Sequence, residues 1–524
     1  MNILIPLSLI LFFGVSLYRR EWGIYLIILL LPSYQIRFQV FGVPATFLEG
    51  MILLLAVSAL IQILLSLRGS PRSNPNEIAA LAGFRTVARN DKLTTFFIIL
   101  FLIAAAISVF TAPDMTRAAG IFKAYFLEAV LVYFLIRLII NSREKLEKLF
   151  KVFSVMVLYL SVYGLYQFVT LHNLPHSWWA VDIASRRIVS VLNHPNALAL
   201  ILGPILAMLI IRQPARLASD LPATASKALR AGSVAGGQKT KLAWAAIITG
   251  LIAFYLTFSR AGWLALVVTI IIFGFLAKFH NPLCPPYLKG EVKPQTPPLK
   301  LGGGCLPAAL SLARRAGVGL LLSLSVIIIT IFAIPFSRGK LLELTNANDP
   351  SKQNRYVLWN AAADLIKKHP VTGVGLMGFR EHFQNYPVGP DQVVQNYPHN
   401  FFLNFWLETG LLGLASMIGL LAIFFGKVYK ILTSPSPPRE EGTNPASPPR
   451  TGVPQNSTRF WGGREGEIER GSRRNYALAA AAGMAVIVLH SMVDVSYFKN
   501  DLSVLFWLIY SLPFLPALKP QILA

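Results

Sequence analysis

The sequence contains few charged residues and very little cysteine. Of its 524 residues only 14% are Asp, Glu, Lys or Arg, whereas 54% are hydrophobic, and the mean hydropathy is +0.56. These values exclude an ordinary soluble domain and indicate an integral membrane protein. The two cysteines, Cys284 and Cys305, lie in a Pro- and Gly-rich segment that we place in the cytoplasm. Neither a structural disulfide nor a zinc site is therefore expected.

Acidic residues are also scarce, with 24 Asp and Glu against 48 Lys and Arg, a net charge of +24. In a soluble protein this excess would suggest nucleic-acid binding. Here most basic residues fall between apolar runs, where the positive-inside rule accounts for them, so no nucleic acid partner is expected. The segment from Gly232 to Thr240 is only close to a phosphate-binding loop, because Gln238 separates the glycine from the lysine and no strand precedes it. We interpret it as a flexible cytoplasmic loop.

Long apolar runs dominate the rest of the chain. A helix needs about 20 residues to cross about 30 Å of hydrocarbon, and twelve or thirteen runs approach this length. Their approximate ranges are 3–18, 22–40, 46–66, 95–112, 120–140, 150–171, 193–211, 242–258, 261–279, 316–336, 400–426, 475–495 and 503–518. The second is the weakest, because Pro32 and Arg37 interrupt it. The predicted fold class is all-α, a polytopic membrane protein of about 12 to 13 transmembrane helices.

The distribution of basic residues predicts the orientation. The loops 68–92 and 212–241 are rich in Lys and Arg and are placed inside. Three segments then lie outside, namely 172–187, the turn at Ser259 and Arg260, and 337–399. We divide the chain into an N-terminal membrane bundle (1–336), a large periplasmic loop (337–399) and C-terminal membrane helices (400–524). Two Pro- and Gly-rich cytoplasmic insertions, near 280–313 and 433–472, are expected to be disordered.

The large outer loop begins with a pattern typical of an amphipathic helix. Tyr356, Trp359, Ala363 and Ile366 recur at three- and four-residue spacing, and Pro370 should stop the helix. Arg355 then lies at the start of this helix. One interpretation is contact with lipid headgroups; the other is an anion site, since free backbone N–H groups are pooled there.

The same loop enters the membrane at His399 and Asn400, and Glu408, Gly410 and Gly413 follow on the next helix. A histidine here is either a polar group at the water boundary or a general base, because its ordinary pKa is near neutrality. A charge two turns into a membrane helix is costly, so Glu408 should face the interior and pair with a base. The two glycines fit close helix packing as well as a functional role.

Arg260 is expected at a hairpin tip on the same outer face, in the sequence LTFSRAGW. A charge at the interface needs no special explanation. Two guanidinium groups opposite a histidine would nevertheless form a diphosphate clamp beside a base, with Arg260 and Arg355 binding the anion and His399 taking the proton. The motif NHPN, Asn193 to Asn196, starts a helix on this face, and we expect Asn193 or Asn196 to cap it.

The pattern of residues from Arg355 to Gly413 resembles the O-antigen ligase and polymerase superfamily. Nine residues separate the His-Asn pair at 399 and 400 from Gly410, and two more separate Gly410 from Gly413, as in the ligase signature. The tetrapeptide from Ser259 to Gly262 resembles the Ser-Arg-Gly turn of the family, with alanine in the glycine place. The resemblance extends over about 193–494.

This resemblance implies a multi-pass protein of the bacterial inner membrane with its active site on the periplasmic face. It implies a donor glycan on undecaprenyl diphosphate and an acceptor that is a glycan, lipid A-core or a surface polymer. Carried over by position, Arg260 and Arg355 would bind the diphosphate and His399 would activate the acceptor hydroxyl, with inversion at the anomeric carbon. The chain has no Asp-x-Asp pair to hold a metal ion. Arginines would therefore neutralise the leaving group, and no metal or other cofactor is expected.

Other functions stay open at this point. The first alternative within the same class is an O-antigen or exopolysaccharide polymerase. A different class is a transporter related to bicarbonate uptake, which the charged residues in predicted spans would suit: Lys123, Glu128, Glu408, His490 and Asp494. The last is a non-catalytic partner in a glycan export complex.

Overall fold

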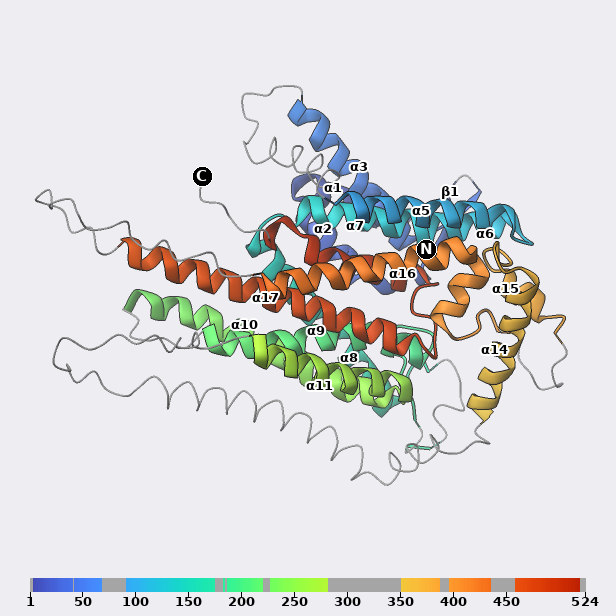
Figure 1. Ribbon diagram of the computed structural model, residues 1–524. Helices are drawn as coiled ribbons and strands as arrows, with labels where there is room; N and C mark the ends of the chain where they lie inside the picture. Colours follow the sequence, from blue (N-terminus) through green and yellow to red (C-terminus); the bar gives the residue numbers. More distant parts are fainter. Residues whose placement is uncertain are drawn as a thin grey trace, which may run out of the picture.

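The structure is a computed structural model that describes residues 3–40, 42–67, 91–174, 182–183, 186–219, 227–280, 350–386, 395–434 and 458–518 (Figure 1). Most of these residues are helical. The longer helices are α1 (Leu4–Tyr18), α2 (Arg20–Leu29), α3 (Phe47–Leu67), α5 (Lys92–Phe110), α7 (Glu128–Ile139), α8 (Arg143–Thr170), α9 (Pro195–Ser219), α10 (Lys227–Leu256), α11 (Arg260–His280), α14 (Pro350–Lys368), α16 (Phe401–Thr433), α17 (Thr458–His490) and α18 (Asn500–Ser511). The short helical elements are η1 (Leu31–Gln35), α6 (Met115–Ile121), the π-helical η2 (Phe122–Leu127), α15 (Gly378–Phe383), η4 (Leu512–Phe514) and η5 (Pro516–Leu518).

The long helices lie alongside one another in a bundle (Figure 1). The pairs α9 and α17, α8 and α10, and α5 and α16 pack closely. The span within α9 and the segment from Asn500 to Leu518 are almost entirely buried, so they form the centre of the bundle. Other helices expose large apolar side chains, such as Leu53, Phe96 and Phe275. Exposed apolar stripes of this extent suit a lipid environment rather than water.

Within the described residues, seven helical segments are long and apolar enough to cross a membrane, and three shorter apolar helices accompany them. The chain is therefore a helical, multi-pass membrane protein. The predicted span 316–336 lies outside the described residues, as does the insertion near 280–313 except for His280. The predicted number of 12 to 13 spans stays a prediction.

Three expectations about local structure are wrong. The apolar run 22–40 is not one helix, because α2 ends at Leu29, Pro32 lies in the turn η1, and the chain then forms an antiparallel hairpin of β1 (Arg37–Val40) and β2 (Val43–Thr46). The fold is thus not purely α. The loop 232–240 is part of α10, and the insertion near 433–472 is helical from Thr458, where α17 begins. Membrane helices here continue beyond their apolar residues.

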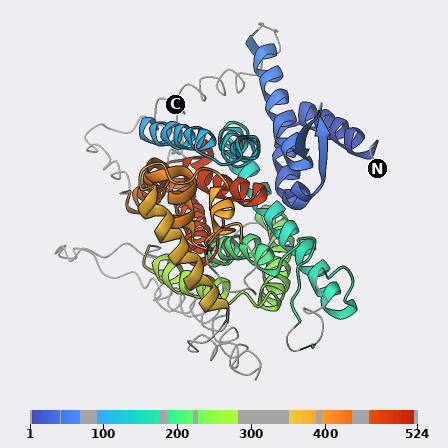
Figure 2. The ribbon, with the colours of Figure 1, turned by 90° about the vertical axis from the view of Figure 1, so that its right-hand side faces the viewer.

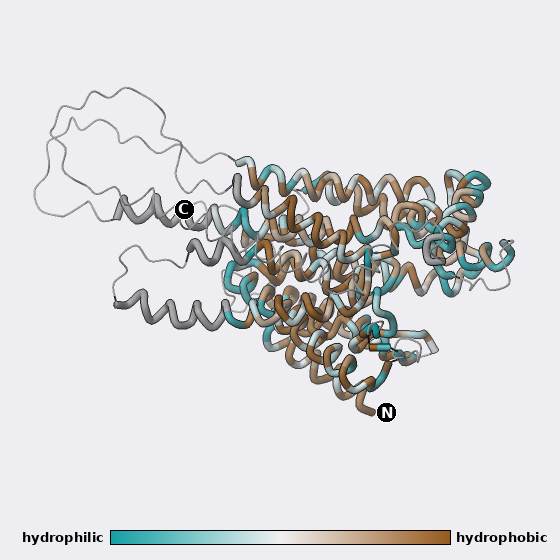
Figure 3. Tube along the Cα trace, turned by 90° about the horizontal axis from the view of Figure 1, so that it is seen from below, coloured by the Kyte–Doolittle hydropathy of each residue, from teal (hydrophilic) through white to brown (hydrophobic). Residues whose placement is uncertain are grey.

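One end of the bundle carries an additional small layer. Seen from that end, α14 lies across the ends of the membrane helices (Figure 2). Hydrophobic residues fill the middle of the bundle, and hydrophilic residues gather at this end (Figure 3). The helix α14 stops at Lys368, before Pro370 as predicted. Its buried residues, however, are Leu358, Ala361 and Ala362, and Tyr356 is 60% exposed.

The predicted apolar face of α14 is therefore rotated by about one residue from the observed one. The buried side chains pack against Phe379 and Phe383 of α15 and Leu407 of α16. From the sequence we expected an amphipathic helix lying along the membrane surface. Instead it packs on other parts of the protein, and this packing selects a different face.

Candidate active site at the capped end of the bundle

His399 lies at the end of the loop that precedes α16 and has a positive φ of 50°. Asn400 is the N-cap of that helix, because its Oδ1 accepts hydrogen bonds from the N–H groups of Phe402 and Leu403, each at 3.1 Å. Its Nδ2 donates to the carbonyl of Met492 at 2.9 Å. The predicted residue Asn400 thus fixes both the start of α16 and the connector between α17 and α18, and through them the position of His399.

A carboxylate from this connector contacts His399. The Nδ1 atom of His399 lies 3.2 Å from Oδ1 of Asp494, and its Nε2 lies 3.4 Å from Oε1 of Gln395. Asp494 is itself held in place, because Oδ1 accepts from the N–H of Val495 at 2.8 Å and Oδ2 accepts from Nδ2 of Asn196 at 3.2 Å. When Nδ1 carries the proton and donates it to Asp494, the lone pair of His399 is on Nε2, and Gln395 must then turn its NH2 group rather than its oxygen toward that atom. This is the arrangement of an oriented general base.

Asn196 connects this pair to an arginine that the sequence analysis did not single out. Its Oδ1 accepts from Nη2 of Arg187 at 2.9 Å, and Nε of Arg187 donates to the carbonyl of Thr257 at 2.8 Å. The expected capping role of Asn196 is wrong: the first-turn N–H of Asn196 itself donates to the ring Nδ1 of His194 at 3.1 Å. The NHPN motif therefore positions charged groups at the site.

The arginines at this end raise the local positive potential. Arg260 begins α11 and is close enough to Arg187 to act on it electrostatically. Burial, and next the charge of Arg260, lower the pKa of Arg187 to about 10. Arg187 still carries its charge at neutral pH, so two guanidinium groups lie near each other. Arg355 lies in α14 and acts electrostatically on His490.

His490 connects the elements that carry these arginines. It is the last residue of α17 and is buried, and its Nε2 lies 3.2 Å from the hydroxyl of Ser259, the residue before Arg260. A Cβ at Gly262 would come within 3.1 Å of the His490 ring. The close approach of α11 to α17 therefore requires a small residue in the SRAG sequence, and it is Gly262 that provides it.

Close packing explains why positions 410 and 413 of α16 are glycines. Gly410 has φ 68° and ψ −175° inside the helix, which is kinked there. The loop after α14 packs into the kink: the N–H of Leu411 donates to the carbonyl of Val371 at 2.9 Å, and that of Val374 donates to the carbonyl of Leu407 at 2.6 Å. A Cβ at Gly410 would collide with the Val371 carbonyl, and one at Gly413 would collide with the Thr409 side chain.

Glu408 is fully buried, as predicted, beside this kink. Its predicted pairing with a base is not found among the described residues, since no side chain there hydrogen-bonds either of its oxygens. A buried carboxylate is costly when charged, and the cation that acts on Glu408 electrostatically is Arg117. Glu408 does not contact His399 through any hydrogen bond of the described structure.

A chain of hydrogen bonds runs from His399 through Asp494 and Asn196 to Arg187, three residues that sequence reasoning missed as site residues. Arg260 and Arg355 are related to this chain through their electrostatic effects on Arg187 and His490. Asp494 and His490 attracted attention only as charged or polar residues within an apolar run, and the NHPN motif only as a helix start. These residues are far from His399 in the sequence, so their contacts could not be predicted from it. In the described part of the chain no group of three or more His, Cys, Asp or Glu side chains is placed to hold a metal ion.

Comparison with known families gives one match. Residues 245–418 match the model of the family described as O-Antigen ligase, which confirms the resemblance to this superfamily for about a third of the chain. The match contains every site residue predicted from the sequence, whereas Arg187, Asn196 and Asp494 lie outside it. No curated protein matches the chain.

Proposed function

Because residues 245–418 are a domain of the O-antigen ligase superfamily, which processes lipid-linked glycans in membranes, we propose that this protein transfers a glycan from a lipid diphosphate to an acceptor hydroxyl. The observation that carries the proposal is the pair of His399 and Asp494, 3.2 Å apart, at the end of the bundle that also holds Arg187, Arg260 and Arg355. A base and a group of cations are the two elements that this transfer needs.

In the proposed reaction the acceptor oxygen attacks the anomeric carbon of the donor sugar. The bond from that carbon to the phosphate oxygen breaks, and its electron pair leaves with the lipid diphosphate. The acceptor proton moves to Nε2 of His399, while Nδ1–H remains hydrogen-bonded to Asp494. Attack on the face opposite the leaving group inverts the anomeric carbon.

The arginines are proposed to bind the diphosphate. The leaving group gains negative charge in the transition state, and fixed guanidinium groups stabilise it without reorganisation. Arginine suits this role better than lysine because its planar fork binds phosphate oxygens in pairs. The donor is proposed to be undecaprenyl diphosphate-linked and the face periplasmic, as the basic inner loops favour.

The proposal is tested with purified full-length protein, a lipid-linked glycan donor and an acceptor. His399→Ala should lower the transfer rate by about 100- to 10,000-fold, the range for loss of a general base. The matched control is His382→Ala, in α15 of the same outer layer, which should retain the wild-type rate. Full transfer by His399→Ala, with both variants folded and inserted, would refute the role of His399.

Lipid-linked glycans from a deletion strain separate the two reactions in this class. Accumulation of full-length chains on the carrier would identify a ligase, and accumulation of single repeat units would identify a polymerase. We favour the ligase, because the His-Asn and glycine spacing from His399 to Gly413 follows the ligase signature.

A further inference from the structure

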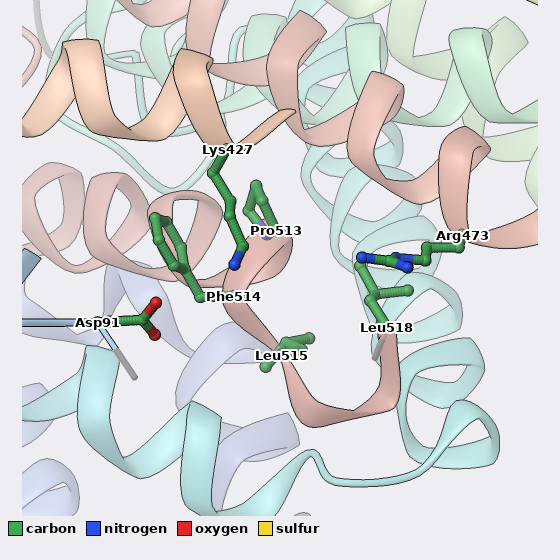
Figure 4. A pocket seen from close by; sticks show the side chains of 7 residues that line it. All are labelled: Asp91, Lys427, Arg473, Pro513, Phe514, Leu515 and Leu518. Atoms are coloured by element: carbon green, nitrogen blue, oxygen red, sulfur yellow. The ribbon is translucent and has the colours of Figure 1, made fainter. Parts of the chain in front are cut away.

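A cavity lies among charged residues that play no part in the proposed transfer. Its volume is about 150 Å³. Figure 4 shows the side chains around it: Asp91, Lys427, Arg473, Pro513, Phe514, Leu515 and Leu518. They come from four separate parts of the chain, namely the start of α5, the last third of α16, α17, and the turns after α18.

The cavity is at the opposite end of the bundle from His399. Both places are connected by α16, which begins at Phe401 beside His399 and reaches Lys427. The helix is kinked at Gly410, and the part beyond the kink, from Leu411 to Lys427, covers about 24 Å at about 1.5 Å per residue. A bilayer has roughly 30 Å of hydrocarbon, and Lys427 and Arg473 are charged, so we infer that the cavity is near the headgroups of the other leaflet.

Two cations from different helices line the cavity. Lys427 extends from α16 and Arg473 from α17 toward the same space (Figure 4). Lys427 Nζ is 5.7 Å from the centre of the Phe514 ring, which fixes the ammonium group against the wall. Nε of Arg473 is buried and has no hydrogen-bond partner among the described residues. Burial also lowers the pKa of Arg473, which means that burial destabilises the charged guanidinium group. A bound anion would offset this destabilisation.

The one carboxylate of the lining is already paired. Asp91 Oδ2 accepts from Nη2 of the buried Arg137 at 2.6 Å. The guanidinium carbon of Arg137 is in turn 5.7 Å from the centre of the Phe514 ring. The charged side chains of the lining are thus two cations, Lys427 and Arg473, and one carboxylate, Asp91, which pairs with Arg137.

The remaining wall is apolar and stiff. Pro513, Leu515 and Leu518 come from the short helical turns η4 and η5, which two prolines restrict. The cavity thus combines a polar region with two cations and an apolar side. Its volume equals about five water molecules at about 30 Å³ each, which accommodates a phosphate group.

From this geometry we propose that the cavity binds the phosphate of an anionic phospholipid from the leaflet opposite the active site. Lys427 and Arg473 hold the phosphate oxygens, and the side formed by Leu515 and Leu518 contacts the first apolar part of the lipid. Basic pockets between membrane helices bind anionic headgroups by this combination of charge and apolar contact. A free phosphate ion shares the charge but lacks the apolar part.

The experiment titrates the purified full-length protein with phosphatidylglycerol in zwitterionic detergent micelles and counts bound lipid by native mass spectrometry. The variant Lys427→Gln/Arg473→Gln should bind at least about 25-fold more weakly than the wild type, about five-fold for each lost cation. The matched control is Lys430→Gln, which removes an exposed charge one turn further along α16 and should bind like the wild type. Equal binding by the double variant and the control would overturn the proposal.

Two further measurements serve as controls for this experiment. The charge-conserving variant Lys427→Arg/Arg473→Lys should retain most of the binding, which shows that loss in the Gln variant is not damage to the fold. Phosphatidylcholine should give no such adduct, and inorganic phosphate at the same concentration should not displace phosphatidylglycerol. Displacement by inorganic phosphate at equal concentration would overturn the lipid assignment in favour of a soluble anion.

Discussion

Asp494 is the residue whose role was least visible before its contacts were known. It accepts hydrogen bonds from Val495 and Asn196 and lies 3.2 Å from His399. In this position Asp494 can accept a proton from Nδ1 of His399 and hold the orientation of the ring, with Nε2 on the side of Gln395. Removing its charge should affect the reaction without removing the base itself.

Asp494→Asn should therefore lower the transfer rate by about 100-fold, the low end of the range for a proton-transfer group. Combined with His399→Ala it should cause little further loss, because residues that act as one unit have non-additive effects. Steady-state kinetics of the two single variants and the double variant measure this coupling. Asp364→Asn is the control, at a half-exposed carboxylate that contacts Lys367 and Tyr386 and no residue of the site. Fully additive losses would mean that the two side chains act independently.

The arginines make a different prediction. Arg260→Ala and Arg355→Ala should each weaken donor binding, and the Lys replacements should recover only part, because the paired geometry of the guanidinium is lost. The loss expected is about 10-fold or more for each Ala variant, corresponding to a charged hydrogen bond of about 1.5–3 kcal/mol. Donor titrations of the folded variants provide the measurement. Unaltered donor affinity in both Ala variants would count against the clamp.

Among the elements, the kink of α16 determines how the outer layer attaches to the bundle. The helix departs from helical geometry at Gly410, and the loop from Val371 to Val374 hydrogen-bonds to the groups exposed there. The N-cap Asn400 fixes the first half of the helix, which carries Leu403 and Leu407 into the small core under α14. The helix α16 therefore positions His399 and also supports α14, which lies over this end of the bundle.

Gly410→Ala should destabilise the protein by at least about 1–3 kcal/mol, because alanine at positive φ is strained and its Cβ would collide with the Val371 carbonyl. Gly426→Ala is a control in the same helix, where a Cβ meets no atom within 4 Å. That variant should be neutral or slightly more stable, since alanine favours helix. Thermal unfolding of both variants compares them. Equal unfolding temperatures would show that the kink is not required.

At the scale of the whole molecule, the ends of the bundle differ in what they carry. His399 and three arginines are at the end that α14 covers, and the cavity with Lys427 and Arg473 is at the other. Charged groups found in predicted spans are partly explained by pairing, as for Lys123 Nζ and Glu49 Oε2 at 2.9 Å. Such pairs need no transported ion for neutralisation.

The two ends should be accessible from opposite sides of the membrane. In a background without Cys284 and Cys305, Lys367→Cys in α14 should react with an impermeant maleimide on intact spheroplasts. Lys148→Cys, near the start of α8, should react only after the membrane is opened. The side chains of Lys367 and Lys148 are 77% and 44% exposed. Both positions can therefore react from water, and a difference in labelling would report the side of the membrane. The reverse labelling pattern would invert the proposed orientation.

The sequence alone determined that the chain is a helical membrane protein, because hydrophobic runs and charge distribution are local properties that need no partner. It also gave the resemblance to the O-antigen ligase superfamily, which the match over residues 245–418 confirms, since the spacing of residues in one segment carries that signal. Pro370 stopping α14 and the approach of the chain to the membrane at Asn400 followed in the same way.

Only the tertiary structure brought Asp494 and Asn196 to His399, because their contacts join residues that are 95 and 298 positions apart in the chain. It also decided which face of α14 is buried, where α16 bends, and that 22–40 forms a turn and hairpin rather than a helix. Each of these depends on a surface supplied by another part of the chain. The local periodicity of a segment is compatible with several conformations. Packing against the rest of the protein selects the one that satisfies the hydrogen bonds of the segment and fills the available space.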